Sequence, residues 1–196
     1  RRHTRYWRDW SSDVCSSDLT NQQDMHQPQH YSDYLKLDSI LDAQHPVSFQ
    51  NGNTPAHDEM LFIVIHQAYE LWFKQLLFEV DSIASTLQKP RLDDNSADLQ
   101  TVVHRLQRCV TIMRTLVQQV DIMETMTPLD FLDFRDLLRP ASGFQSWQFK
   151  VLEARLGLKY DERHGQAYYL SQLRENEVAI IKEAEQKISV LSLLNT

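Results

Sequence analysis

The chain has 196 residues, of which 42% are hydrophobic, and its 20 basic and 27 acidic side chains give a net charge of −7. An acidic balance with scattered basic residues argues against nucleic acid or an anionic membrane as the main partner, and no apolar run approaches the ~20 residues of a membrane-spanning helix. The low content of Gly (4) and Pro (6) favours a single helical domain.

Residues 1–19 differ in character from the rest of the chain. The stretch RDWSSDVCSSDL at 8–19 back-translates, codon by codon, to a string that looks like a sequencing-library adapter read in frame. We therefore expect residues 1–19 to be a non-native extension and exclude them from the fold. Only Cys109 then remains, so there is no disulfide framework, and a reducing, cytoplasmic setting fits best.

Residues 20–54 are predicted to form an N-terminal arm with one short helix. The stretch from 20 to 30 is polar, whereas residues 31–43 have apolar side chains at helical spacing. His45-Pro46 ends this helix, and a loop follows. Because so short a helix is unstable alone, we expect the arm to dock on another surface, in the simplest case the chain's own core.

A long helix is predicted from Thr54 to about residue 88. Thr54 reads as its N-cap and Pro55 as its first residue, and the acidic side chains at 58 and 59 favour the positive end of the helix dipole. Every residue from 60 to 65 is apolar, so we expect this segment to lie inside a core.

His66 is the candidate functional residue of this helix. A buried imidazole needs a partner for each ring nitrogen, and one partner can be a ligand. Glu70 lies one turn further on, where it can satisfy His66 or form half of a metal site with it. The spacing alone does not decide between a core histidine and a ligand-binding one.

A second long helix is predicted for residues 99–126, with one broad apolar stripe. Its basic residues Arg105, Arg108 and Arg114 are expected on a solvated face, with His104 beside them at the surface.

A third helix is predicted to begin with Thr127 as N-cap and Pro128 at its first position, and to end at residue 139. Arg135 shares a face of this helix with Phe131. An arginine among apolar neighbours needs an anion. That anion is either an Asp or Glu of the fold or the carboxylate of a ligand.

The remaining chain is also predicted to be helical. Residues 141–143 form a small-residue turn that permits close backbone approach. A helix follows over 144–156 and ends at Gly157, and another spans 168–195. Asp161 and His164 fall in a polar loop and are expected to be solvated. These patterns predict an all-α bundle of long helices with a buried His and a buried Arg.

Two blocks resemble a known family. They are FIVIHQAYELWFK at 62–74 and METMTPLDFLDFR at 123–135, which runs on to PASGFQSWQF at 140–149. In this order and separation they are similar to the tryptophan 2,3-dioxygenases. The resemblance implies a helical, cytoplasmic homotetramer with haem b (Fe²⁺) and O2 as co-substrate. It implies insertion of O2 across the indole C2–C3 bond of L-tryptophan to give N-formyl-L-kynurenine, the first step of the kynurenine pathway.

The resemblance also implies roles for individual residues. His66, the catalytic residue, hydrogen-bonds the indole N–H over the distal face of the haem, and Arg135 pairs with the substrate carboxylate. Phe131 stands where some members have Tyr, so it lines the pocket without donating a hydrogen bond. The full implied set comprises substrate-binding Phe62, Ile63, Val64, Ile65, His66, Phe131 and Arg135, haem-edge Ser142 and Gly143, and Tyr31, Tyr34 and Leu35 in a neighbouring subunit's pocket.

The resemblance covers residue 31 to the end, roughly the first half of a family member. We therefore expect residues 55–196 to be an incomplete haem-dioxygenase domain, with the axial His beyond Thr196 and no activity in this chain by itself. The alternatives are a non-catalytic all-α interaction module, with His66 and Arg135 satisfied within the core, and a metal-binding bundle that uses His66 and Glu70.

Overall fold

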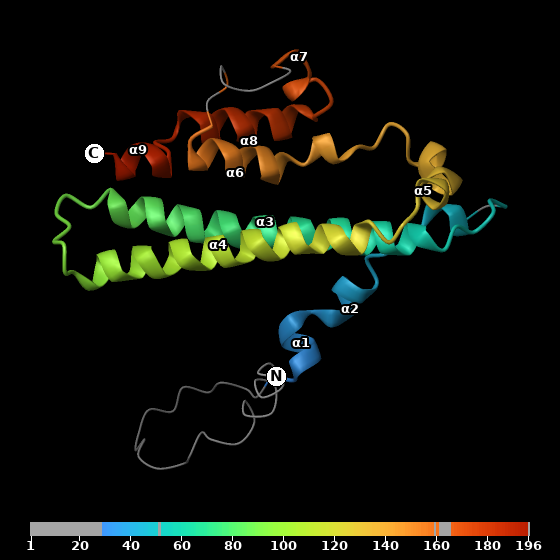
Figure 1. Cartoon of the computed structure of the whole chain (residues 1–196), viewed down its shortest axis with the longest axis horizontal. Helices are drawn as coiled ribbons and strands as arrows, with labels where there is room; N and C mark the ends of the chain where they lie inside the picture. Colours follow the sequence, from blue (N-terminus) through green and yellow to red (C-terminus); the bar gives the residue numbers. More distant parts are fainter. Residues whose placement is uncertain (1–28, 51, 159, 161–165, 196) are drawn as a thin grey trace, which may run out of the picture. The chain divides into compact units, whose positions relative to one another are not determined.

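The structure, a computed structural model, describes residues 29–50, 52–158, 160 and 166–195. All its regular elements within these ranges are helices, which confirms the all-α class (Figure 1). The predicted extension, the polar lead-in before residue 29, and both Asp161 and His164 lie outside the described residues. The chain divides into two compact units, Arg1–Leu41 and Asp42–Thr196.

The first unit contains two short helices where a single one was predicted. They are α1 (Tyr31–Leu35) and α2 (Leu37–Leu41), separated by Lys36 in the left-handed conformation with φ 54°. Neither helix has a buried residue. No packing therefore favours one continuous helix over two, and the prediction of an unbroken helix was wrong.

The second unit is organised around two long antiparallel helices, α3 (Asp58–Leu87) and α4 (Ala97–Met123) (Figure 1). Ser96 caps α4 by accepting a hydrogen bond from the backbone N–H of Leu99. Between the helices lies a core of aliphatic side chains, each worth ~1.5–3 kcal/mol when fully buried. Its members from these two helices are Leu76, Val80, Ile83, Ala84, Val102, Ile112 and Leu116.

Two expectations about the start of α3 were wrong. The helix begins at Asp58, so Thr54 and Pro55 belong to the preceding loop. The apolar run was also expected to be wholly buried, yet Val64 is 47% exposed, while Ile65 is 5% exposed. Successive side chains point in all directions around a helix. Because the described chain packs against only part of α3 here, some of its apolar side chains remain exposed.

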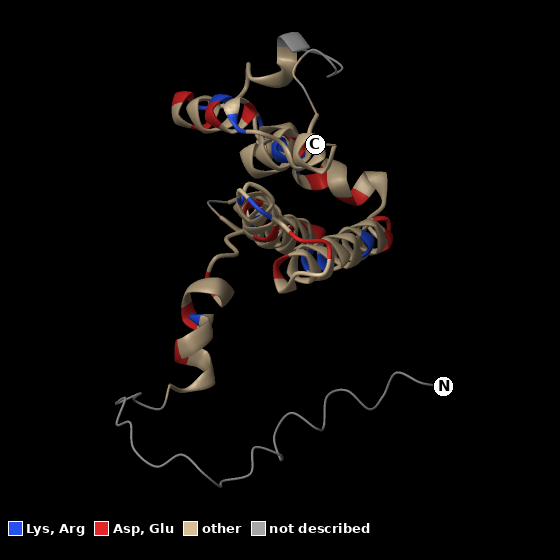
Figure 2. Cartoon of the chain, turned by 90° about the vertical axis from the view of Figure 1, so that its left-hand side faces the viewer, with Lys and Arg blue, Asp and Glu red and all other residues tan. Residues whose placement is uncertain are grey.

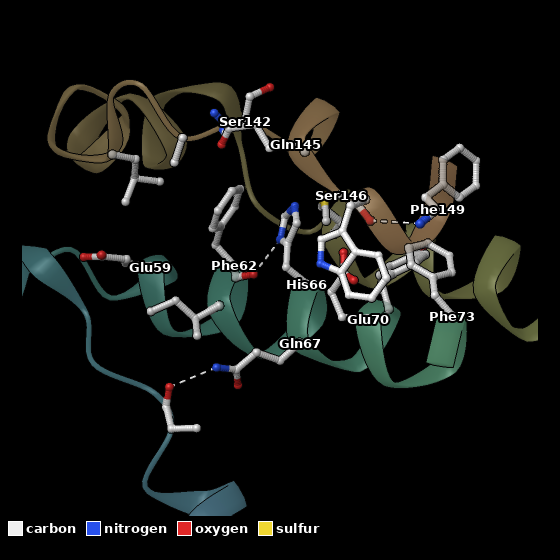
Figure 3. Close-up of a pocket in the computed structure, with 18 of the residues that line it drawn as sticks. Glu59, Phe62, His66, Gln67, Glu70, Phe73, Ser142, Gln145, Ser146 and Phe149 are labelled. Carbon is white, nitrogen blue, oxygen red and sulfur yellow. Dashed lines mark hydrogen bonds between the residues drawn. The ribbon is translucent and has the colours of Figure 1, made fainter. Parts of the chain in front are cut away.

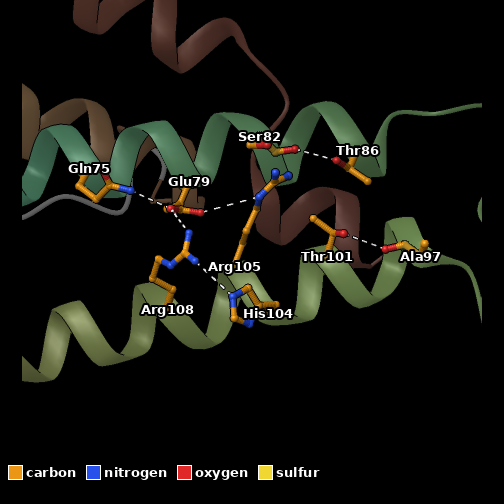
Figure 4. A network of polar contacts seen from close by, with 9 residues as sticks. All are labelled: Gln75, Glu79, Ser82, Thr86, Ala97, Thr101, His104, Arg105 and Arg108. Carbon is orange, nitrogen blue, oxygen red and sulfur yellow. Dashed lines mark hydrogen bonds and ion pairs between the residues drawn. The ribbon is translucent and has the colours of Figure 1, made fainter. Parts of the chain in front are cut away.

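Two arginines predicted to be solvated instead reach a buried carboxylate of α3 (Figure 4). Arg108 Nη1 lies 2.7 Å from Glu79 Oε1, and Arg105 Nε lies 3.9 Å from Oε2. Gln75 donates a further hydrogen bond of 2.7 Å to Glu79 Oε1. Since an ionised carboxylate is costly to bury without a cation, Glu79 draws both arginines toward α3. His104 is exposed, as predicted.

The third predicted helix is confirmed as α5 (Pro128–Arg135), followed by the 3₁₀ turn η2 (Asp136–Leu138). Thr127 and Asp130 form a capping box, each accepting a hydrogen bond from the other's backbone N–H. Hydrogen bonds from the Thr127 side chain and backbone lower the pKa of Asp130 below its ordinary value. Local chemistry therefore fixes where this helix begins.

A 3₁₀ turn η3 (Gly143–Gln145) and α6 (Trp147–Leu156) follow, and α6 packs against α3. Gly157 ends α6 with φ 130°, as the sequence predicted. Beyond it the predicted single helix is instead divided into α7 (Gln166–Tyr169), α8 (Glu175–Gln186) and α9 (Val190–Leu194). Local capping starts two new helices: Glu177 accepts from the N–H of Arg174 at the start of α8, and Ser189 accepts from the N–H of Ser192 at the start of α9.

Lys, Arg, Asp and Glu are interspersed along the described helices (Figure 2). Across the residues that the structure covers, none of the helices is long and apolar enough to span a bilayer.

Candidate functional site

A cavity of about 860 Å³ lies over the first half of α3. This volume falls within the range of small-molecule sites, ~300–1,000 Å³. The walls come from α3, from the chain before η1 and from the segment that leads into α6. The lining includes the aromatic rings of Phe62, Tyr69, Phe73, Trp147 and Phe149. Such a lining suits a flat, largely apolar ligand.

The imidazole of His66 is held in one orientation within this cavity. Its Nδ1 lies 2.7 Å from the backbone carbonyl oxygen of Phe62, one turn back on α3. A carbonyl oxygen only accepts, so Nδ1 carries the proton and Nε2 of the neutral ring is an acceptor. The second nitrogen points away from α3, toward the side of the cavity where Ser142 and Gln145 lie (Figure 3). The cavity thus contains a hydrogen-bond acceptor of fixed direction.

Glu70 does not serve as the partner of His66. Its Oε2 accepts a hydrogen bond of 2.8 Å from Nε2 of Gln148, which also donates to the Glu70 carbonyl at 3.1 Å. The pair joins α3 to α6 at the cavity wall. Within the described ranges, no group of three or more His, Cys, Asp and Glu side chains is placed to hold a metal ion.

Three phenylalanines connect α3 to α5. The ring of Phe62 lies 5.7 Å from that of Phe131 and 5.6 Å from that of Phe134, centroid to centroid. Phe131 and Phe134 pack edge to face at 5.4 Å, and Phe134 is fully buried. These separations and tilts are the favourable ones for aromatic pairs, which adds to the stabilisation from burial. The cluster fixes α5 beside the cavity.

Arg135 does not line the cavity itself, but it contacts Ala141, which does. Its guanidinium carbon is 5.8 Å from the centroid of the Phe131 ring, and Nη1 donates to the carbonyl of Ala141 at 3.3 Å. No carboxylate in the part of the chain that the structure covers forms an ion pair with Arg135. A guanidinium has five N–H donors, so several stay available for an anion.

The turn from Ala141 to Ser146 forms one edge of the cavity, and its backbone is exposed at Gly143. Ser142 Oγ accepts from the N–H of Phe144, and Gln145 Oε1 accepts from the N–H of Ser142, so η3 is capped at its start. A Cβ added to Gly143 would meet nothing within 4 Å. The backbone here is therefore accessible to a flat group that enters beside it.

The structure brings together around the cavity only part of the predicted site. Val64 is exposed and Ile65 belongs to the core, and neither lines the cavity. Tyr31 and Tyr34 belong to the first unit, where each is 69% exposed. Phe131 and Arg135 also do not line it, although both lie on the neighbouring α5. The predicted residues that line the cavity are Phe62, Ile63, His66, Ser142 and Gly143.

Glu59 and Tyr69 are among the lining residues that sequence reasoning missed. Glu59, read there only as an acidic residue near a helix start, is fully buried and accepts from the N–H groups of Val47 and Ser48. Tyr69 donates its hydroxyl to the carbonyl of Leu116 at 2.7 Å, and burial raises the pKa of its phenol. Both depend on contacts between segments distant in sequence, for which no local pattern gives a signal.

The described chain is thus all-α, with an aromatic-lined cavity and an imidazole of fixed orientation within it. A family model described as tryptophan 2,3-dioxygenase matches residues 16–196. The chain belongs to the tryptophan 2,3-dioxygenase family.

Curated relatives agree with the family match. A tryptophan 2,3-dioxygenase of Bdellovibrio bacteriovorus is 52% identical over 152 residues, which are 76% of this chain and 42% of the relative. That of Aedes aegypti is 56% identical over 133 residues, 68% of this chain and 33% of the relative. That of Alteromonas mediterranea is 47% identical over 172 residues, 86% and 46%. The chain spans less than half the length of these relatives.

Proposed function

We propose that the full-length protein is a haem-dependent dioxygenase that inserts O2 across the indole C2–C3 bond of L-tryptophan to give N-formyl-L-kynurenine. This is the first step of tryptophan catabolism by the kynurenine pathway. The observation that carries the proposal is His66, whose Nε2 acceptor points into an aromatic cavity beside Phe62, in a chain of this family.

The substrate is a zwitterion with a flat apolar body, so it needs an apolar slot, an acceptor for the indole N–H and a planar cation. Phe62 and Ile63 supply walls of the slot, with Phe131 behind them. His66 Nε2 accepts from the indole N–H, and its Nδ1–H bond to the Phe62 carbonyl keeps that acceptor aimed. This holds the C2–C3 bond in position, and positioning of this kind lowers the barrier to reaction.

Arg135 pairs with the carboxylate of the substrate. A fork of two parallel N–H···O bonds is worth ~1.5–3 kcal/mol and fixes the orientation of the amino acid. The guanidinium lies over the Phe131 ring and has no carboxylate partner in the described part of the chain, which supports this role.

The cofactor proposed is haem b, which when bound supplies the activation of O2. The size of the cavity and its aromatic walls support a flat macrocycle as the cofactor. Ser142 and Gly143 would lie at the haem edge, where the backbone is open. We assign no axial iron ligand among the described residues.

We also propose a homotetramer in which the helices α1 and α2 complete a neighbouring subunit's pocket through Tyr31, Tyr34 and Leu35. These helices bury no residue, and the two tyrosines are largely exposed. The cytoplasm is the proposed compartment, since Cys109 is free.

The test is to express the full-length protein, add haemin and dithionite, and follow N-formylkynurenine formation from L-tryptophan in air. Turnover supports a dioxygenase. A folded protein that neither binds tryptophan nor forms product would instead favour the non-catalytic interaction module.

A further inference from the structure

A short segment runs alongside the first half of α3 and forms part of the cavity wall. This strap comprises residues 43–49, which lead into and include η1 (Val47–Phe49). Ala43, His45 and Val47 of the strap line the cavity. The position of the strap therefore determines how much room the cavity has on this side of His66.

Glu59 anchors one end of the strap. Its Oε1 accepts from the N–H of Val47 at 2.7 Å, and its Oε2 accepts from the N–H of Ser48 at 2.8 Å. Glu59 and Ser48 are both 0% exposed. The two N–H groups open a 3₁₀ turn and have no partner within it, so the carboxylate satisfies both.

Further contacts complete the attachment. Ser48 Oγ accepts from the N–H of Ala56 at 3.0 Å, which closes the loop between the strap and α3. At the other end, Gln67 Nε2 donates to the Ala43 carbonyl at 2.9 Å, and Gln44 Nε2 donates to Gln67 Oε1 at 2.6 Å. The strap is thus held at both ends by side chains of one helix, with Ile63 of the cavity lining between them.

We propose that Glu59 is a positioning residue that sets substrate affinity by holding the strap against α3, without itself touching the substrate. The proposal rests on the proposed function for the identity of the substrate. The attachment of the strap by Glu59 involves only residues of this chain and is independent of that function.

The decisive variant is Glu59→Gln in the full-length protein, because an amide of equal size can accept at one atom but presents N–H to the other backbone N–H. We expect the KM for L-tryptophan to rise about tenfold, with kcat nearly unchanged, as for the loss of an interaction that serves binding.

The matched control is Glu79→Gln, the same change at a buried glutamate of the same helix that does not line the cavity. We expect it to lower the unfolding midpoint while leaving KM at the parent value. If both variants lose stability and neither changes KM, Glu59 is only structural and the proposal is wrong.

Amide hydrogen exchange of the strap separates this inference from the proposed function. We expect the N–H groups of Val47 and Ser48 to be protected in the parent and to exchange at least about tenfold faster in Glu59→Gln, with α4 unaffected. Equal protection in parent and variant would overturn the inference even if the enzyme is active. A parent that forms no product refutes the function, but exchange still decides the role of Glu59.

Should Glu59→Gln fail to fold, Ser48→Ala provides the same test more gently. It keeps the carboxylate and removes only the acceptor for the N–H of Ala56. A smaller rise in KM with faster exchange of the strap supports the proposal, whereas parent values of both contradict it.

Discussion

His66 and Arg135 are each only partly satisfied by the chain itself. His66 uses one ring nitrogen within its own helix and leaves the other directed into the cavity. Arg135 donates one hydrogen bond to the backbone carbonyl of Ala141, and its guanidinium lies over the Phe131 ring. Both side chains were predicted to be buried, but each is only partly buried. Their unpaired nitrogens are therefore open to a ligand or to water, and ligand binding by these residues is a proposal.

Arg135→Lys in the full-length protein should weaken L-tryptophan binding about tenfold or more. Lysine keeps the charge, but it loses the planar fork that contacts both carboxylate oxygens and stacks on a ring. Titration of the two proteins with L-tryptophan measures the change.

Tryptamine, which lacks the carboxylate, is the matched ligand. It should bind poorly to the parent and discriminate little between parent and variant. Equal affinity of the two proteins for L-tryptophan would refute the assignment of the carboxylate to Arg135.

Among the elements, α3 combines the most roles. Its first half carries the cavity residues, its middle carries the core, and Glu79 holds α4 through Arg108. Glu79→Gln should lower the free energy of unfolding by about 2 kcal/mol, because it removes a charge-assisted bond to a group that is half exposed and can return to water. Urea denaturation measures this change, and a midpoint equal to that of the parent would show that the pair contributes nothing.

Gly157, at the end of α6, gives a second prediction at this scale. A Cβ there would lie 2.9 Å from Leu191 Cβ of α9, and φ 130° is a conformation that side chains disfavour. Gly157→Ala should therefore cost about 1–3 kcal/mol of stability.

Gly143→Ala is the control, since its added methyl meets nothing within 4 Å and its φ is not positive. It should leave the thermal midpoint within experimental error. Equal midpoints for the two variants would mean that the contact between α6 and α9 is loose.

Helix ends were predictable from the sequence where the capping is local. Thr127, Pro128 and Gly157 act within one turn of their helices, and each prediction is confirmed. The same local signal failed at Thr54 and Pro55. There the N–H of Ala56 is bound by Ser48, and Glu59 turns its carboxylate to the strap, so tertiary contacts delay the start of the helix.

The site, like the helix ends, was predictable only in part. The helix pattern singled out His66 as a candidate, whereas Phe62, one turn back on the same helix, was assigned to the site through the family resemblance. Arg108 was misplaced because its partner is 29 positions away in the chain, and such a pair leaves no periodic pattern. Contacts of this kind follow only from the packing of α3 on α4.

At the scale of the whole molecule, α3 and α4 expose large apolar side chains. Leu71 is 56% exposed, Phe78 71% and Val117 69%. Large apolar side chains with this much exposure are candidates for contacts between subunits in the proposed homotetramer.

Deleting residues 20–41 from the full-length protein should damage both assembly and tryptophan affinity, while leaving the strap in place. The reason is that α1 and α2 bury nothing in this chain and are proposed to complete a neighbour's pocket. Sedimentation and tryptophan titration measure the two effects. An intact tetramer with parent affinity after the deletion would refute the proposed role of this arm.

The most direct test is a crystal structure of the full-length protein with L-tryptophan bound. We predict the indole ring beside Phe62, its N–H donating to His66 Nε2, and the carboxylate paired with Arg135, with the Nδ1 bond of His66 to the Phe62 carbonyl preserved. An indole ring bound elsewhere, or a His66 ring turned so that Nε2 faces away from the substrate, would contradict the account.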